Sequence, residues 1–194
     1  MIRLMHQLRS VESITRANSS VFTEYVLTNV GPLVRDAEVL VRCTFAQCLP
    51  TLAEIGLRYL DLGRALAPDR LGRASSGLDD DEATYDTALA ELHTAIEDCA
   101  IAMLSDASSQ VRRALLGGGQ IASLCLFLGR AKTAEVVLSH AITYLNDPDW
   151  RLRSSFFEAA VPLAACVGGR SVEEYILPLM LQALGGASVS KQWG

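Results

Sequence analysis

One spacing of apolar and charged positions occurs three times along the chain. An apolar residue lies two places before an aspartate, and an arginine, directly preceded by another apolar residue, follows that aspartate by six places. The three copies contain the charged pairs Asp36 and Arg42, Asp106 and Arg112, and Asp147 and Arg153. The identical internal spacing indicates a structural repeat, and each copy fits the turn between two antiparallel helices.

The segment after each turn carries a small or apolar stripe at helical spacing. Positions zero, four, seven, eleven and fourteen, counted from the apolar residue before the arginine, form one face of a helix with 3.6 residues per turn. The stripe residues are Val41, Phe45, Cys48, Leu52 and Ile55, then Val111, Leu115, Gly118, Ala122 and Cys125, then Leu152, Phe156, Ala159, Leu163 and Cys166. The step from Asp106 to Asp147 is 41 residues, within the roughly 40–47 typical of HEAT and armadillo repeats. We therefore predict an all-α fold, an α-solenoid of HEAT-type antiparallel helical hairpins with about three full repeats and half-repeats at both ends.

The pattern divides the chain as one solenoid segment over residues 1–194. The expected parts are a partial repeat over 1–14, repeats over 20–62, 82–129 and 130–169, a loop insertion over 63–81, and a partial repeat with a tail over 170–194. The insertion is rich in Pro, Gly, Ser and acidic residues and poor in apolar ones, which is typical of a loop. Within it, Arg70 and Arg73 precede Ser75 at a spacing that suits basophilic kinases, a match that is frequent by chance.

The charges of the turn have a structural interpretation. Asp147 followed by Pro148 fits an N-cap with proline at the first helical position, where the missing N–H has no helical partner anyway. Arg153 lies under two turns further on, within reach of the aspartate of its own or an adjacent unit. In repeat stacks such pairs form a ladder between neighbours. A ligand-binding role for these charges is the less favoured alternative.

Composition excludes several classes of function. The net charge is −5 without a long basic run, whereas nucleic-acid binding needs a clustered basic footprint. No apolar run is long enough for a membrane span, and the first residues are too short in apolar length for a signal peptide. The five cysteines form no Cys-x-x-Cys pair, so buried thiols are favoured over disulfides or a zinc site.

Motifs for catalysis or cofactor binding are not found. The glycine triplet 117–119 lacks the Gly-Lys-Ser/Thr of a phosphate loop and falls within a helical pattern, which favours close helix packing there. The three histidines are far apart, and no serine or cysteine lies in a nucleophile elbow. We therefore expect no catalytic, cofactor-binding or metal-binding residue.

Longer segments carry a resemblance to a known family. They are Val21–Leu27, Val41–Arg42, Leu52–Glu54, Leu57–Leu60, Tyr85–Thr87, Leu126–Lys132, Val137–His140, Ile142–Asp147, Trp150–Arg153 and Phe156–Phe157. Together they resemble the HEAT-repeat region of the regulatory, kinase-like subunit of the class III phosphatidylinositol 3-kinase complex, over nearly all of residues 21–184. The glycine triplet and the tail after Leu184 depart from the family pattern.

The resemblance implies a non-catalytic scaffold for protein–protein interaction. The full-length family member carries a kinase-like domain before the repeats and a β-propeller after them, and neither has a counterpart in this sequence. The implied partners are the lipid kinase catalytic subunit, a Beclin-type subunit and adjacent domains of a longer chain, without nucleic acid. The implied location is cytoplasmic, peripheral to endosomal or autophagic membranes, in autophagy and vacuolar sorting. The alternative is a helical domain of an unrelated enzyme or ligand-binding protein whose site is not visible as a motif.

Overall fold

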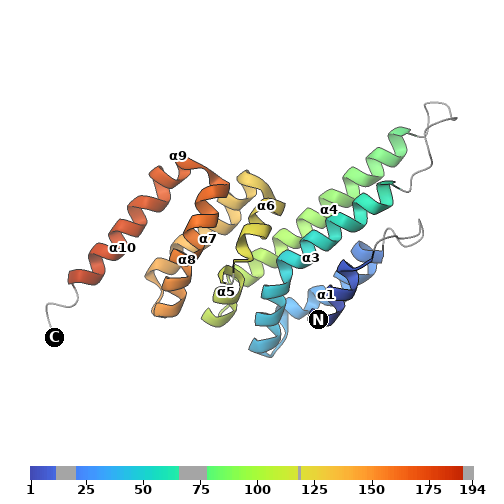
Figure 1. The fold of residues 1–194 in the computed structure, drawn as a ribbon. Helices are drawn as coiled ribbons and strands as arrows, with labels where there is room; N and C mark the ends of the chain where they lie inside the picture. The colour runs from blue at the N-terminus through green and yellow to red at the C-terminus, as the bar shows by residue number, and fades with distance from the viewer. Residues whose placement is uncertain (12–20, 66–77, 118, 190–194) are drawn as a thin grey trace.

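The computed structural model of the chain describes residues 1–11, 21–65, 78–117 and 119–189. Within these ranges the regular structure is helical throughout, without a strand. Helices of alternating direction stack side by side from the N-terminal to the C-terminal end of the chain (Figure 1). The predicted all-α solenoid is confirmed.

The helices are short where the chain turns and long where it packs. Their bounds are α1 Ile2–Arg9, η2 Val21–Leu27, α2 Thr28–Val30, η3 Gly31–Arg35, α3 Val39–Ala65, α4 Leu78–Leu104, α5 Ser109–Leu116, α6 Ile121–Lys132, η4 Thr133–Leu138, α7 Ser139–Ala141, η5 Ile142–Asn146, α8 Trp150–Val167, α9 Gly169–Ser171, η6 Val172–Ile176 and α10 Leu177–Val189.

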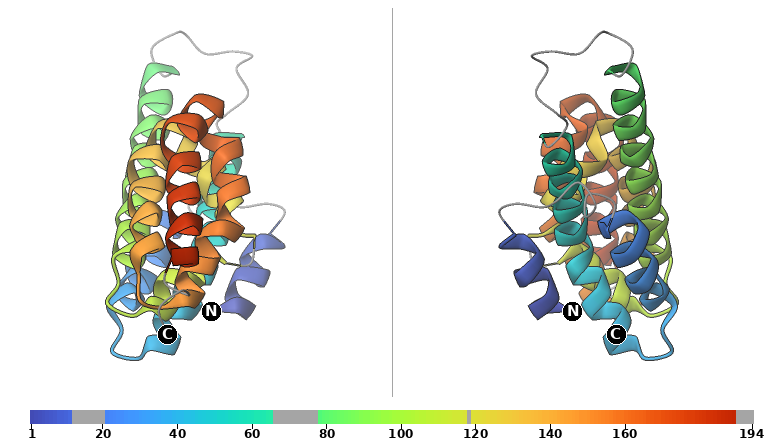
Figure 2. Two further views of the ribbon diagram at one scale, coloured as in Figure 1. Left: turned by 90° about the vertical axis from the view of Figure 1, so that its left-hand side faces the viewer. Right: turned by 90° about the vertical axis from the view of Figure 1, so that its right-hand side faces the viewer.

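Consecutive helices pair as hairpins. The run η2–α2–η3 is followed by α3, α4 by α5 and α6, and η4–α7–η5 by α8, while η6 and α10 come last. The first helices of the first and third hairpins are built in the same way. Each begins as a π-helix, η2 or η4, and continues through a short α-helix into a 3-10 segment at the turn. The segment η6 is also π-helical. In the end-on views α3 and α4 lie side by side and α1 lies beyond α3 (Figure 2).

Glycines end the second helices of two hairpins. Gly129 has φ 75° and breaks α6 into two parts, the second of which continues into η4, and Gly168 has φ 86° and caps α8. Residues with a Cβ rarely adopt this left-handed conformation. The change of direction at these glycines starts the next hairpin.

Two expectations are corrected in the middle of the chain. The stripe from Val111 to Cys125 does not lie on one helix, because α5 ends at Leu116 and α6 begins at Ile121. The expected loop over 63–81 is helical at both margins, since α3 continues to Ala65 and α4 begins at Leu78. The rest of that segment, including Ser75, lies outside the described residues.

The predicted stripe lies in the core. Its large members Phe45, Leu52, Leu115 and Phe156 are at most 1% exposed. Val41, Ala122 and Cys166 are only partly buried, and Gly118 lies outside the described residues. In the second hairpin the buried positions after the break are Ile121, Leu124, Cys125 and Leu128. The break between α5 and α6 therefore shifts which positions face the core, whereas the sequence pattern assumes one continuous helix.

The first helix is attached to α3 by polar and apolar contacts. Met5 is 4% exposed and belongs to the continuous core. Arg58 on α3 donates hydrogen bonds to the carbonyls of Arg9 and Val11, and Arg9 forms an ion pair with Glu54. These contacts hold α1 against α3, the second helix of the first hairpin.

Close helix approach occurs at Gly56 in α3 and not at Gly119. A Cβ placed on Gly56 would lie 2.7 Å from Cε1 of Phe22 and 2.8 Å from Cδ1 of Leu92. The missing side chain lets η2 and α4 approach α3 at the same point. At Gly119, in contrast, an added Cβ would meet nothing within 4 Å.

We expect Gly56→Ala to destabilise the protein by about 1 kcal/mol. Alanine gains about 0.5–1 kcal/mol of helix propensity, but overpacking costs about 1–3 kcal/mol, so the clash prevails. Chemical denaturation of the variant measures the difference. Gly185→Ala in α10, where an added Cβ meets nothing within 4 Å, is the matched control and gains the propensity alone. A stabilised Gly56→Ala protein would show that the contact is loose.

Candidate functional site

The three turn aspartates share one backbone contact. A carboxylate oxygen of Asp36 accepts the N–H of Glu38, that of Asp106 accepts the N–H of Ser108, and that of Asp147 accepts the N–H of Asp149, each at 2.8 Å. This is an Asx turn, in which the side chain replaces a backbone acceptor two residues before its donor. The aspartates therefore fix the shape of each turn.

The three turn arginines also share one position. Nη1 of Arg42 donates to the carbonyl of Asp36 at 2.7 Å, and Nη1 of Arg153 donates to the carbonyl of Asp147 at 2.7 Å. Arg112 makes the equivalent bond to the carbonyl of Asp106. In each case the same nitrogen also reaches the next carbonyl along the chain. Each guanidinium is thus anchored to the backbone of its own turn.

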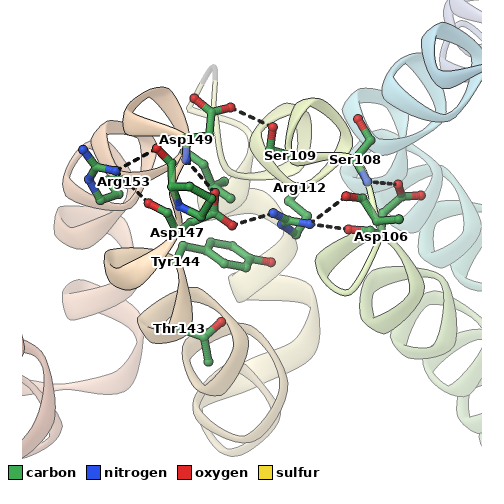
Figure 3. A network of polar contacts seen from close by, with 12 residues as sticks. Asp106, Ser108, Ser109, Arg112, Thr143, Tyr144, Asp147, Asp149 and Arg153 are labelled. Carbon is green, nitrogen blue, oxygen red and sulfur yellow. Dashed lines mark hydrogen bonds and ion pairs between the residues drawn. The ribbon is translucent and has the colours of Figure 1, made fainter.

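In Arg42 and Arg112, further guanidinium nitrogens bind the aspartate of the next hairpin. Nε and Nη2 of Arg42 lie 2.8 and 3.1 Å from the two carboxylate oxygens of Asp106, a bidentate ion pair. Nη2 of Arg112 lies 2.7 Å from Oδ2 of Asp147 (Figure 3). The side chains are 9–17% exposed. We call these two ion pairs the rungs, and they form a ladder that joins three neighbouring turns.

The structure corrects two details of the sequence interpretation. The N-cap of α8 is Asp149, whose side chain accepts the N–H of Arg151, rather than Asp147. Asp147 and Arg153 do not pair through their side chains, because Arg153 contacts the backbone carbonyls of Asp147 and Pro148 and not the carboxylate. The aspartate is occupied from the other side by Arg112. The ion pairs therefore run between hairpins and not within one turn.

Sequence reasoning missed other polar links around the second rung. Ser109 donates a hydrogen bond of 2.7 Å to Oδ2 of Asp149. The hydroxyl of Tyr144 donates to the buried carbonyl of Leu104, and the Tyr144 ring lies 5.7 Å from the Arg112 guanidinium carbon. These contacts join residues 32–40 positions apart and depend on the stacking, so no local sequence pattern marks them.

The environment of Asp106 makes the ladder sensitive to acid. Burial by itself would raise the pKa of this carboxyl, but hydrogen bonds from Arg42 and from the Ser108 N–H outweigh burial and lower the pKa below its ordinary value of 3.8. A carboxyl whose pKa is lowered by folding stabilises the protein above its ordinary pKa, and this stability is lost as the pH falls through the folded value.

We expect stability to fall as the pH drops below about 4, and to fall less in Asp106→Asn, which cannot lose that charge. Urea denaturation at about pH 6 and about pH 3 measures the two slopes. Asp61→Asn is the control, because Asp61 lies near the C-terminal end of α3, where its carboxylate accepts the Tyr85 hydroxyl. Equal acid sensitivity in the wild type and Asp106→Asn would contradict the assignment.

A groove opens between α1, α3, α5 and α8. Its volume is about 1100 Å³, and its lining includes Leu40, Arg113, Trp150 and Arg151. Leu40 is 74% exposed and Trp150 is 63% exposed. The Arg151 guanidinium lies 5.5 Å from the centre of the Trp150 ring. Tryptophan and arginine are the residue types most enriched among the energetic hot spots of protein interfaces.

The described residues offer little for other chemistry. No group of three or more His, Cys, Asp or Glu among them could hold a metal ion. Burial raises the pKa of Cys99 to about 11 and that of Cys125 to about 12, so both thiols stay protonated at neutral pH. Over the same part of the chain, none of the helices combines the length and the apolar character that crossing a bilayer requires.

Comparison with known proteins gives a consistent match. The chain matches the family model described as PIK3R4-like, middle domain, over residues 1–188. It is 34% identical over 181 residues to the probable serine/threonine-protein kinase vps15 of Dictyostelium discoideum, covering 91% of this chain and 9% of that protein. It is 39% identical over 153 residues to vps15 of Schizosaccharomyces pombe (72% and 8%), and 32% identical over 147 residues to VPS15 of Saccharomyces cerevisiae (74% and 10%). The chain thus spans about a tenth of the length of these relatives.

Proposed function

The chain belongs to the family of PIK3R4-like middle domains, and from this membership we propose that it is a non-catalytic scaffold for protein partners. The resemblance to the regulatory subunit of the class III phosphatidylinositol 3-kinase complex is confirmed by the family match. The relatives bear the name of serine/threonine-protein kinases, whereas the match of this chain is to their middle, helical part. We assign no catalytic role to this segment.

The observation that supports a scaffold best is the groove between α1, α3, α5 and α8. It combines an exposed tryptophan, an exposed leucine and two arginines on the second helices of successive hairpins. Such a surface suits a protein segment better than a small molecule, because exposed, interface-type side chains from several helices line it. The proposed repeats are of the HEAT type, with the turn aspartates and arginines as their structural motif.

The family resemblance supplies the partners of the proposal. They are the lipid kinase catalytic subunit and a Beclin-type subunit, with which the full-length family member assembles. The proposed location is the cytoplasmic side of endosomal, autophagic or vacuolar membranes, reached through partners. The proposed processes are autophagy and endosomal or vacuolar protein sorting.

The test substitutes the groove in a full-length protein that contains this segment. We expect Trp150→Ala to weaken binding of at least one of the two named subunits by roughly 30-fold, as a hot-spot loss of about 2 kcal/mol would. Purified subunits and a titration of complex formation measure this. Leu126→Ala is the control, since Leu126 is 79% exposed on α6 and does not line the groove.

Unchanged helicity in both variants separates lost binding from lost folding. Wild-type affinity of Trp150→Ala and of Arg151→Glu for both subunits would remove the groove from the proposal. A catalytic turnover that depends on residues of this segment would overturn the scaffold role itself.

A further inference from the structure

The ladder contains three arginines in the same position but only two rungs. Arg42, Arg112 and Arg153 each donate through Nη1 to the carbonyl of their own turn aspartate. Arg42 uses Nε and Nη2, and Arg112 uses Nη2, for the carboxylate of the next hairpin. Nε and Nη2 of Arg153 make no contact of this kind with any described residue. Nε and Nη2 of Arg153 are therefore in position to bind a carboxylate that no described residue supplies.

The chain has no aspartate to complete this rung. Asp149 is the last aspartate in the sequence, and only Glu158, Glu173 and Glu174 carry carboxylate side chains after Arg153. Glu158 lines the groove between α1 and α8, and Glu174 lies near Arg170 and the Tyr175 hydroxyl. None of these glutamates pairs with Arg153 among the described contacts, so a carboxylate matching Asp106 or Asp147 would come from another polypeptide segment.

The surface beside Arg153 also has an exposed apolar side. The helix α10 packs against η5, the 3-10 segment that leads into the Asp147 turn, and is the last helix of the stack (Figure 1). Leu177 and Leu181 on this helix are 47% and 61% exposed, and Tyr175 just before it is 52% exposed. Elsewhere in the stack, the first helix of a hairpin is followed by a second helix that starts with an Asx turn. Here that helix is lacking among the described residues.

We propose that Arg153 and the exposed side of α10 form one docking surface for an additional helix that begins with an Asx-turn aspartate. The carboxylate binds Nε and Nη2 of Arg153 as Asp106 binds Arg42, and the apolar face of the helix covers Leu177 and Leu181. The partner is thus defined chemically as an acidic turn followed by an amphipathic helix. The interface continues the ladder already formed between the three hairpins, and the inference does not depend on the groove.

A copy of the chain's own third turn is the sharpest probe. Residues 145–168, which contain the Asp147 turn and α8, are appended in place of the chain from Leu184 onward. The copy of Asp147 then falls 39 residues after Asp147, as Glu174 falls 39 residues after Glu135. Four proteins are compared. They have either Arg153 or the R153A substitution, and in each case the appended helix carries either the copied aspartate or alanine in its place. We expect the appended aspartate to raise the folding equilibrium constant roughly tenfold when Arg153 is present, and to have no such effect with R153A.

The matched control is the same cycle at Arg112 and Asp147 within one chain, where the rung is present. Hydrogen exchange of the appended helix measures docking separately, and protection that is lost with R153A supports the proposal. An appended helix without protection, or an aspartate effect that is equal with and without Arg153, would overturn it. In the chain without the appended helix, R153A is expected to change the equilibrium constant less than about threefold.

Discussion

Phe156→Ala is expected to lower the free energy of unfolding by about 3–5 kcal/mol. Phe156 is fully buried in α8 and contacts the neighbouring Phe157 ring edge-on at 5.9 Å. Truncation removes a large apolar side chain and leaves a cavity between packed helices, which cannot close without moving the hairpins. Phe45 is 1% exposed at the equivalent position of α3, so Phe45→Ala is expected to cost a similar amount.

Urea denaturation followed by circular dichroism measures this loss. The control on the same helix is Val161→Ala, because Val161 is 76% exposed and surface substitutions change stability by about 0.5 kcal/mol or less. If Phe156→Ala cost less than about 1 kcal/mol, the hydrophobic register that defines the repeats would be misassigned.

The sequence was sufficient for features that depend on local spacing. The six-residue interval between Asp36 and Arg42 places both side chains at one turn, because half of it is the turn itself and half is the first turn of a helix. The buried stripe through Phe45 and Phe156 follows from helical periodicity in the same way. These features recur at each copy, so one correct copy predicts the others.

Features that depend on stacking could not be predicted. The sequence left open whether an arginine binds the aspartate of its own unit or of a neighbour, and only the stack brings Arg42 to Asp106 and Arg112 to Asp147. The contact of Gly56 with Phe22 and Leu92 joins three helices from distant parts of the chain. The groove around Trp150 likewise draws its lining from four helices and has no signature in any one of them.

The break in the second hairpin shows where a periodic pattern misleads. The spacing from Val111 to Cys125 fits one uninterrupted helix, but the glycines between Leu116 and Ile121 end the first helix. Glycine costs about 1 kcal/mol per residue in a helix interior, and three in succession outweigh the pattern of the flanking residues.

Asp147→Ala is expected to destabilise the chain by about 2–3 kcal/mol, the second largest effect. It removes the carboxylate from the Arg112 rung, whose side chains are 15% and 17% exposed. Nε of Arg112 is already buried without a partner, and Nη2 would then lose its only carboxylate. Breaking a fully buried pair costs about 3–5 kcal/mol, and the partial exposure of this one reduces the effect.

The most direct measurement is a pair of double-mutant cycles in urea denaturation, because these distinguish ion pairs between hairpins from ion pairs within one turn. In the first cycle Asp147→Ala is combined with Arg112→Ala, and in the second with Arg153→Ala. We predict a coupling free energy of about 1–2 kcal/mol in the first cycle and additivity within about 0.5 kcal/mol in the second. Additivity for Arg112 together with coupling for Arg153 would contradict the ladder.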